Sequence, residues 1–414
     1  LFSDWVATKQ HVPESNFEEL TWAQMAELDE LLRALMHEAR QTLVAFEAAD
    51  ARTTEELLEK VMPSIRALPT RRRLDLSRSR GRAAKTWLRK TEATVKQMEF
   101  LFEELDGSPM ATGGQIGLLH RMFAGIQTAS SEAEVRFAEL VGRLKPLFVD
   151  LQADIKVLDE RFGGRYWDIP GVPFRPAIAD SEHGQQQWTG RTVVETLLHT
   201  GNDANLYALQ ESVYKFTLEE ISRLKELFSE KGARAIQGIW DVVNTLFPDL
   251  AAAQWKLRRV KVVKEAPQPV TWTTREGTTI TLPGGYYPKV HDPYVSEKAA
   301  RRQEKEDVLT EAVRSSVWSS GRPRDGAAKK RLRDKNNRPI AKEPVILTHS
   351  ILLQHLRDVL HLVHVGPWIK DFDRINRADS FRKEVTRTHG EDLYKAIRYW
   401  LNRTARPERR RKDG

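Results

Sequence analysis

Histidines are the first residues in this sequence whose type and spacing could do chemistry. Four of them, His349, His355, His361 and His364, fall within one apolar stretch, and the last two are three residues apart. At that spacing they share one face of a helix and could chelate a metal. The H-E-x-x-H pattern is missing, however, and Asp358 is the one carboxylate at a ligand offset beside them. We therefore interpret these histidines as residues that bridge or cap neighbouring helices.

Two further patterns lie close together between residues 284 and 292. His291 and Asp292 follow a pair of tyrosines and could form an acid–base pair, but adjacent residues of an extended segment point to opposite sides. Asp292 before a proline more simply begins a turn. Gly284-Gly285 could approach a phosphate, yet no Lys-Ser/Thr follows and no helix opens directly after it. We interpret this pair of glycines as a tight turn.

The remaining candidates also favour structural interpretations. The carboxylate pairs Glu103-Glu104 and Glu219-Glu220 are typical of solvated helix faces or of helix N-termini. The sequence contains no G-x-S-x-G, no P-loop and no dinucleotide fingerprint, and its zero cysteines exclude thiol catalysis and disulfides. We therefore predict a non-enzymatic chain with no catalytic residue, no cofactor and no metal site.

The composition indicates a globular chain with a basic balance. Hydrophobic residues make up 40% and charged residues 30% of the 414 residues, so a sizeable core can form. No apolar run of about 18 residues occurs, and no integral membrane segment is expected. The first residues, Leu1-Phe-Ser-Asp-Trp, lack both an initiator Met and a signal pattern, so we expect a segment of a longer polypeptide.

The net charge of +8 is concentrated in three runs. Residues 66–90 hold ten Lys and Arg against one acidic residue, and residues 296–339 and 403–414 are also rich in basic residues. Basic clusters attract polyanions, and arginine forks match phosphates, although solvated connections remain the alternative. The predicted nucleic-acid-binding residues are Arg71, Arg72, Arg73, Arg78, Arg80, Lys329, Lys330, Arg331, Arg409, Arg410 and Arg411.

The elements that must position these residues are nearly all helical. We predict a mainly α fold, an elongated multi-helix bundle with one small β-hairpin in about residues 259–282. In the hairpin, two runs rich in β-branched residues, 270–274 and 278–282, flank a connection that contains Gly277, and residues 259–264 alternate and could add a strand. Pro283 and the two glycines end the second strand, and Tyr286-Tyr287-Pro288 leaves in an extended conformation.

Apolar periodicity predicts the following helices. Residues 115–128 and 131–162 form two helices, and Val135, Ala138, Leu144, Leu151 and Leu158 are among the inward residues of the second, which Pro146 kinks without ending. The segments 191–199, 204–216, 233–246, 347–365, 369–388 and 392–402 are helices as well. A capping box at Thr217 begins another helix, which Gly232 ends, and Pro248 ends the helix 233–246.

Several short motifs stand out along the chain. They are Gly284-Gly285-Tyr286-Tyr287-Pro288 with Asp292-Pro293, the segment 237–244 with Trp240 and Asn244, and Thr200-Gly-Asn-Asp-Ala-Asn205. Leu105-Asp-Gly107 stands before a Gly-rich turn and an amphipathic helix. These motifs resemble landmarks of one family, the large polyvalent proteins of tailed phages and prophages, and the resemblance covers about residues 95–402. It implies a virion protein, an internal capsid protein that is delivered into the host cell with the DNA, or a Dar-type antirestriction protein.

From this resemblance we expect a non-enzymatic module of a large virion protein that helps form the ejection apparatus or protects incoming DNA. The expected partners are other virion or ejection proteins, copies of the chain itself, and phage DNA. An accessory domain of a polyvalent phage enzyme, with a helicase, methyltransferase or lytic transglycosylase elsewhere on the polypeptide, is the alternative. A free-standing DNA-binding protein would need a recognition helix, and none of the helices shows the expected base-reading residues.

We expect five regions in the chain. They are an N-terminal helical region at 1–165, a central helical region at 166–258, the hairpin and Gly-Gly-Tyr-Tyr-Pro turn at 259–295, a C-terminal helical region at 296–402 and a basic tail at 403–414.

Overall fold

The computed structural model describes residues 52–63, 65–66, 102, 105–106, 117–175, 187–212, 214–258, 262, 264–289, 347 and 350–405. In these residues the protein is mainly helical, and a single two-stranded antiparallel hairpin interrupts the helices. The fold class predicted from the sequence is therefore confirmed. Most of the alternating segment 259–264, the possible third strand, lies outside the described residues.

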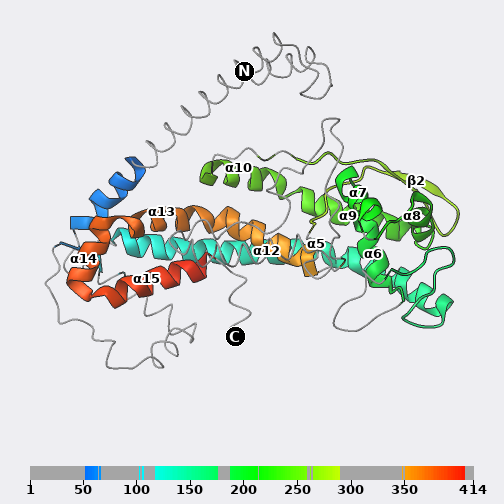
Figure 1. Cartoon of the computed structure of the whole chain (residues 1–414), viewed down its shortest axis with the longest axis horizontal. Coiled ribbons are helices and arrows are strands. Elements are labelled where there is room, and N and C mark those ends of the chain that lie inside the picture. The colour runs from blue at the N-terminus through cyan, green and yellow to red at the C-terminus, as the bar shows by residue number, and fades with distance from the viewer. Residues whose placement is uncertain are drawn as a thin grey trace, which may run out of the picture.

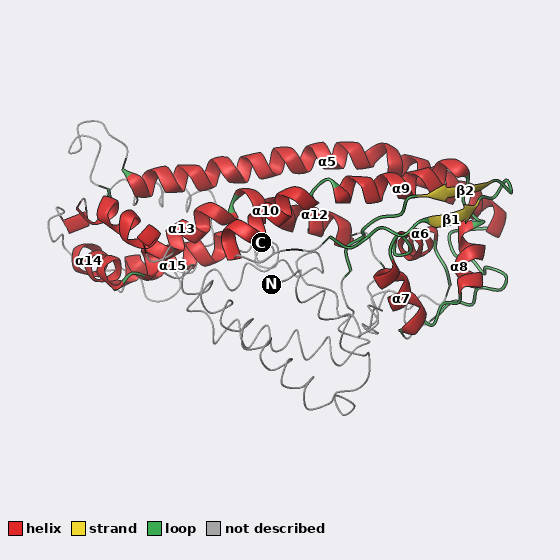
Figure 2. Ribbon diagram, turned by 90° about the horizontal axis from the view of Figure 1, so that it is seen from above, coloured by secondary structure: helices red, strands yellow, loops and turns green. Residues whose placement is uncertain are grey.

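A 45-residue helix, α5 (Leu118–Phe162), runs the length of the described part, and the other helices lie along one side of it (Figure 2). The sequence predicted two helices here, and that prediction was wrong. The helix continues through Ser130 and Ser131 at the expected break, and their hydroxyls donate back to the carbonyls of Ile126 and Gln127 instead of capping a second helix. Pro146 lies inside the helix without ending it, as expected.

The inward face of α5 differs from the predicted one. Leu144, Leu151 and Leu158 are buried as expected, but Val135 is 61% exposed and Ala138 is exposed as well. The buried face continues instead through Ala133 and Leu140. The error arose because apolar residues lie on both sides of this helix, so that periodicity alone does not identify the side that meets the core.

Two clusters of buried side chains hold the helices together. The larger joins the C-terminal two-thirds of α5 to the hairpin and to the central helices. The smaller lies at the N-terminal end of α5 with the last three helices and with Phe102. Residues 52–63 are helical and contribute to the smaller cluster. The other helices are α6 (Gly190–Leu198), α7 (Asp203–Glu211), α8 (Leu218–Lys225), α9 (Glu230–Asn244), α10 (Phe247–Arg258), α12 (Ser350–His364), α13 (Gly366–Arg377), α14 (Asp379–His389) and α15 (Glu391–Thr404) (Figure 1).

The hairpin forms as its sequence predicts. Strands β1 (Val270–Thr273) and β2 (Thr279–Leu282) pair antiparallel, with Val270 opposite Leu282. Gly277 in the connection has φ +80°, a conformation that glycine adopts without the steric cost of a side chain. Trp272 of β1 is fully buried, and its indole N–H donates to the carbonyl of Lys225, so the hairpin is fixed to the C-terminal end of α8.

Four predicted helix boundaries were wrong. The predicted helix 204–216 ends at Glu211, and two other boundaries were wrong because a glycine or a proline lies in the first turn of a helix rather than at its end. Gly232 lies within α9, whose N-cap is Ser229. Pro248 lies in the first turn of α10, a helix that the sequence analysis missed. The predicted helix 369–388 is divided into α13 and α14, because Ala378 takes an extended conformation between them.

The start of α9 is also a junction of three elements. The carboxylate of Asp154, on α5, accepts hydrogen bonds from the backbone N–H and the hydroxyl of Ser229 and lies 3.3 Å from the guanidinium of Arg275 in the hairpin connection. A Cβ on Gly232 would lie 2.1 Å from the same carboxylate, so glycine is required for this approach. A buried anion thus compensates the positive end of a helix and binds the hairpin.

We predict that Asp154→Ala lowers the free energy of unfolding by about 3 kcal/mol, because it removes the acceptor and leaves the Arg275 guanidinium, three-quarters buried, without it. Denaturant titration measures this. The control is Asp150→Ala, one turn earlier on α5, which breaks an ion pair with the exposed Lys231 and should cost less than about 1 kcal/mol. Equal losses in the two variants would contradict the role assigned to Asp154.

Candidate functional site

The Gly284–Pro288 turn packs into the larger core and is the most heavily bonded polar element there. Gly284 has φ +78°, and a Cβ at this position would lie 2.0 Å from the carbonyl of Gln268. A Cβ on Gly285 would lie 2.4 Å from Cβ of Trp240. Both positions therefore require glycine because the backbone of the turn touches neighbouring elements directly.

The segment 200–205, which joins α6 to α7, receives this turn. The carbonyl of Gly201 accepts from the backbone N–H groups of Gly285 (2.8 Å) and Gln268 (3.0 Å). Asn202 is the N-cap of α7, and its amide donates to the carbonyl of Gly285 at 3.2 Å. The amide of Asn205 donates to the carbonyl of Tyr287 at 3.0 Å. Both asparagines are fully buried, so the carbonyls of Gly285 and Tyr287 meet partners inside the core.

Helix α9 closes the turn from the other side. The amide of Gln237 bonds both to the carbonyl of Gly284 (3.1 Å) and to its N–H (3.0 Å). Trp240 is fully buried, and its indole N–H donates to the carbonyl of Leu198 at the end of α6. The amide nitrogen of Asn244 would lie 3.0 Å from a Cβ on Gly285. The turn is thus held between α9 and the ends of α6 and α7.

A buried pair of titratable side chains lies beneath the turn. The hydroxyl of Tyr287 donates to Oε2 of Glu195 on α6 at 2.8 Å, and both residues are fully buried. The ring of His199, one helical turn after Glu195, stands perpendicular to that of Tyr287 with centroids 5.1 Å apart. Burial, and then the neighbouring charge of Glu195 and the hydrogen bond to it, raise the pKa of Tyr287 well above the usual value of about 10.

This geometry decides between the two interpretations of the glycines. A phosphate-binding loop presents free backbone N–H groups to its ligand. Here the N–H of Gly284 is bonded to Gln237 and that of Gly285 to Gly201, so neither is available to a phosphate. The turn is a structural junction, as predicted. His291 and Asp292, the other candidates in this segment, lie outside the described residues.

The histidines of α12 are positioned by different neighbours. His355 is buried with its ring centroid 6.0 Å from that of Tyr286, whereas Nδ1 of His364 is 3.4 Å from a carboxylate oxygen of Glu132 on α5. His349 lies outside the described residues. Over the part of the chain that the structure describes, no group of three or more histidine and acidic side chains is arranged to hold a metal ion.

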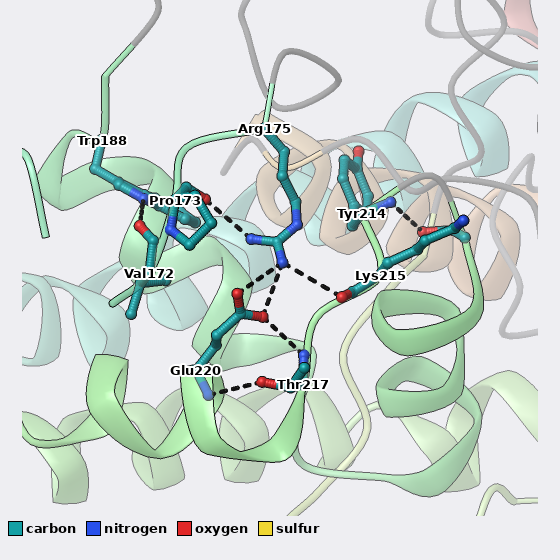
Figure 3. A network of polar contacts seen from close by, with 9 residues as sticks. Val172, Pro173, Arg175, Trp188, Tyr214, Lys215, Thr217 and Glu220 are labelled. Atoms are coloured by element: carbon teal, nitrogen blue, oxygen red, sulfur yellow. Dashed lines mark hydrogen bonds and ion pairs between the residues drawn. The ribbon is translucent and has the colours of Figure 1, made fainter. Parts of the chain in front are cut away.

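A second polar network fixes the connector before α6 to the start of α8. The guanidinium of Arg175 contacts both carboxylate oxygens of Glu220 (2.9 and 2.8 Å) and the carbonyls of Pro173 and Lys215 (Figure 3). Its charged carbon lies 4.4 Å from the centre of the Phe216 ring. Although burial raises the pKa of the Glu220 carboxyl, the hydrogen bonds from Arg175 and from the backbone of Thr217 outweigh that effect and hold it below its usual range.

Glu220 thereby serves two elements at once. Its Oε2 also accepts from the N–H of Thr217, while the Thr217 hydroxyl accepts from the N–H of Glu220, which completes the predicted capping box. The network therefore holds the connector before α6 against the start of α8.

The basic residues predicted to bind nucleic acid are not among the described residues. This applies to Arg71, Arg72, Arg73, Arg78 and Arg80, to Lys329, Lys330 and Arg331, and to Arg409, Arg410 and Arg411. Their role therefore stays a prediction. Comparison with protein-family models, with curated proteins and with solved structures finds no match to this chain.

The sequence analysis named the turn, Trp240 and Asn244 but missed Glu195, His199 and Gln237 as their partners. One signal was present for Glu195, a lone carboxylate between Val193-Val194 and Leu197-Leu198 in an otherwise apolar helix. A charged residue in such a run is rarely buried without a partner. What the sequence could not supply was the partner itself, which is 92 residues away.

Tyr287→Phe removes the buried hydrogen bond to Glu195 and should lower the free energy of unfolding at pH 7 by about 1.5–3 kcal/mol. The unfolded tyrosine ionises near pH 10, below the raised pKa of the folded one. The contribution of this hydroxyl is therefore constant below pH 10 and declines as pH rises above it. Denaturant titrations from pH 7 to 11 should show the difference between wild type and variant shrinking above pH 10.

Tyr399→Phe is the matched control, because Tyr399 is 47% exposed, and it should leave the unfolding free energy nearly unchanged. The free energies of unfolding of wild type and Tyr287→Phe should converge between pH 9 and 11. If their difference stays constant or widens, the assigned hydrogen bond is contradicted.

Proposed function

We propose that this chain is a non-enzymatic helical module of a large polyvalent phage protein, packaged in the capsid and ejected with the genome. In that setting it helps form the ejection apparatus or protects the incoming DNA. The described helices supply the scaffold, and the basic runs outside them supply the contact with DNA or with neighbouring virion proteins.

One observation carries this proposal: the motifs on which the family resemblance depends meet in space. The segments 200–205, 237–244 and 284–288 are far apart in the sequence but bond to one another within a single junction. A fourth motif, Leu105-Asp-Gly107, has the same character, because the Asp106 carboxylate accepts from the N–H groups of Leu119 and His120 at the start of α5. Short segments that resembled the family by chance would not be expected to hold one fold together. The structural role of these motifs therefore supports the resemblance.

The role of the motifs also favours a structural module over a catalytic one. Glycine, asparagine and glutamine at the junction are bonded to the backbone of this chain, and Tyr287 is fully buried against Glu195. An accessory domain of a polyvalent phage enzyme would have the same internal design, so it remains the second candidate. The rest of the parent polypeptide distinguishes the two, since a helicase, methyltransferase or transglycosylase module would lie on the same chain.

Virions induced from the strain that encodes the chain test its location. We expect mass spectrometry of purified, nuclease-treated particles to detect its peptides, and an epitope tag on the chain to enter recipient cells with the phage DNA. Detection only in the lysate of the producing cells, with a major capsid protein as the positive control in the particles, would refute packaging.

Binding to duplex and single-stranded DNA over a salt series tests the basic runs. Affinity should fall steeply with salt, and replacing Arg71, Arg72 and Arg73 by serine should reduce the log–log slope by about 0.9 for each duplex phosphate that these arginines neutralise. The same comparison applies to Arg409, Arg410 and Arg411.

The matched control removes three arginines that pair with glutamates on their own helices, namely Arg223, Arg234 and Arg387. Its net charge equals that of each test variant, so a similar decrease of slope in all three would show that overall charge rather than the runs attracts DNA. Absence of binding at low salt would make the runs linkers or protein contacts.

Within the residues that the structure describes, no helix is long and apolar enough to span a membrane.

A further inference from the structure

Between residues 124 and 149 the outward face of α5 carries a single charged residue along its centre, Lys145. Six exposed residues lie on this face, because they are three, four or seven positions apart in the helix. They are Ala124, Ser131, Val135, Ala138, Gly142 and Val149. Val135 is 61% and Val149 58% exposed, and nothing lies within 4 Å of the position a Cβ on Gly142 would take. The other described helices all lie on the opposite side of α5 (Figure 2). Exposed helix faces are normally rich in charged residues, so this face is adapted to a contact.

The small and apolar positions are symmetric about residue 137. In an antiparallel pair of α5 helices with a twofold axis at that level, Val135 meets Ala138 of the second copy, Ser131 meets Gly142 and Ala124 meets Val149. The members of each pair lie the same number of residues before and after the axis to within one residue, a mismatch of about 1–2 Å along the helix. Each pair sets a small residue against its partner, which permits the close approach of two helices.

The charges beside this face follow the same symmetry. One flank of α5 holds Glu132, Arg136, Glu139 and Arg143 in that order, all exposed, and Glu132 also lies 3.4 Å from Nδ1 of His364 on α12. In a twofold antiparallel pair the same flank of both copies meets, and residue i contacts j as j contacts i. Glu132 then stands opposite Arg143, and Arg136 opposite Glu139, on both sides of the axis. Within one copy Arg136 and Glu139 already pair at 2.6 Å, so dimerisation would extend this pair into a four-charge network.

We propose that the partner of this face is a second copy of the chain, bound through an antiparallel α5–α5 contact centred near residue 137. The paired length from residue 124 to residue 149 is about 39 Å, enough for about seven turns of helix. The stripe by itself would fit many helices. The shared symmetry axis of the stripe and of the flanking charges is what selects a second copy. This inference does not depend on the proposed phage setting.

Single cysteines give a direct test, because the chain has none of its own. Under mild oxidation Ala138→Cys should cross-link into a dimer, since the two copies of residue 138 lie next to the axis. Val149→Cys and Ala124→Cys should each fail, because their copies are separated by about 36–39 Å, whereas the double variant Ala124→Cys/Val149→Cys should cross-link. A parallel pair would cross-link all three single variants, and random collision would cross-link the three equally.

The wild-type chain should show a concentration-dependent monomer–dimer equilibrium in sedimentation velocity, and Gly142→Arg should weaken it at least tenfold. The control is Gln152→Arg, exposed on the same helix beyond the paired length, which should leave association unchanged. Arg136→Glu should also weaken association, and Arg136→Glu/Glu139→Arg should restore it.

Three outcomes would overturn the proposal. They are a wild-type chain that stays monomeric at the highest soluble concentration, equal cross-linking of Ala138→Cys and Val149→Cys, and a lower melting temperature of the monomer in Gly142→Arg. The last would mean that another part of the same chain covers this face.

Discussion

The fold depends on the cost of placing a polar turn in an apolar core. The backbone of Gly284, Gly285 and Tyr287 lies among buried side chains, where each unpaired N–H or carbonyl would cost about 1–3 kcal/mol. Gln237, Gly201, Asn202 and Asn205 meet these groups one by one. The start of α7, the end of α6 and the middle of α9 must therefore lie where they do, because only there can they reach the turn. Glycine is needed at positions 284 and 285 for the same reason, since a side chain there would push apart the backbone segments that bond to each other.

A feature of this fold could be predicted from the sequence when the residues that determine it are close together in the chain. The hairpin, the capping box of α8 and the tight turn were predicted correctly, because each is fixed by residues a few positions apart. Helix α5 was predicted as two helices, and Val135 and Ala138 were assigned to the wrong side of it. The second error concerns what packs against α5, and no local pattern specifies that. The outward face of α5 was mistaken for the core face because it also carries apolar residues.

The junction shows the same limit for a site. Sequence reasoning identified Trp240, Asn244 and the turn as a group through a family resemblance, but it did not place them in contact. The bonds that join them span 82 to 92 residues for Asn205, Asn202 and Glu195. A lone glutamate within an apolar run signalled that a buried partner exists, and only the fold supplied Tyr287 as that partner. The basic runs are the opposite case. Their charge predicts binding to nucleic acid, and because they lie outside the described residues the structure does not test this prediction.

This division between local and distant interactions bears on the proposed route through a narrow ejection channel. Helices make their backbone hydrogen bonds within a few residues and form in about a microsecond. The junction, by contrast, closes loops of more than 80 residues, and closing a loop of that length precedes any stabilisation from the contacts it makes. For a chain that is ejected unfolded, α9 and the separate helices would re-form first and the Gly284–Pro288 turn would dock last. Until it docks, the larger core lacks Tyr287, so the turn would determine when the module becomes rigid in the recipient cell.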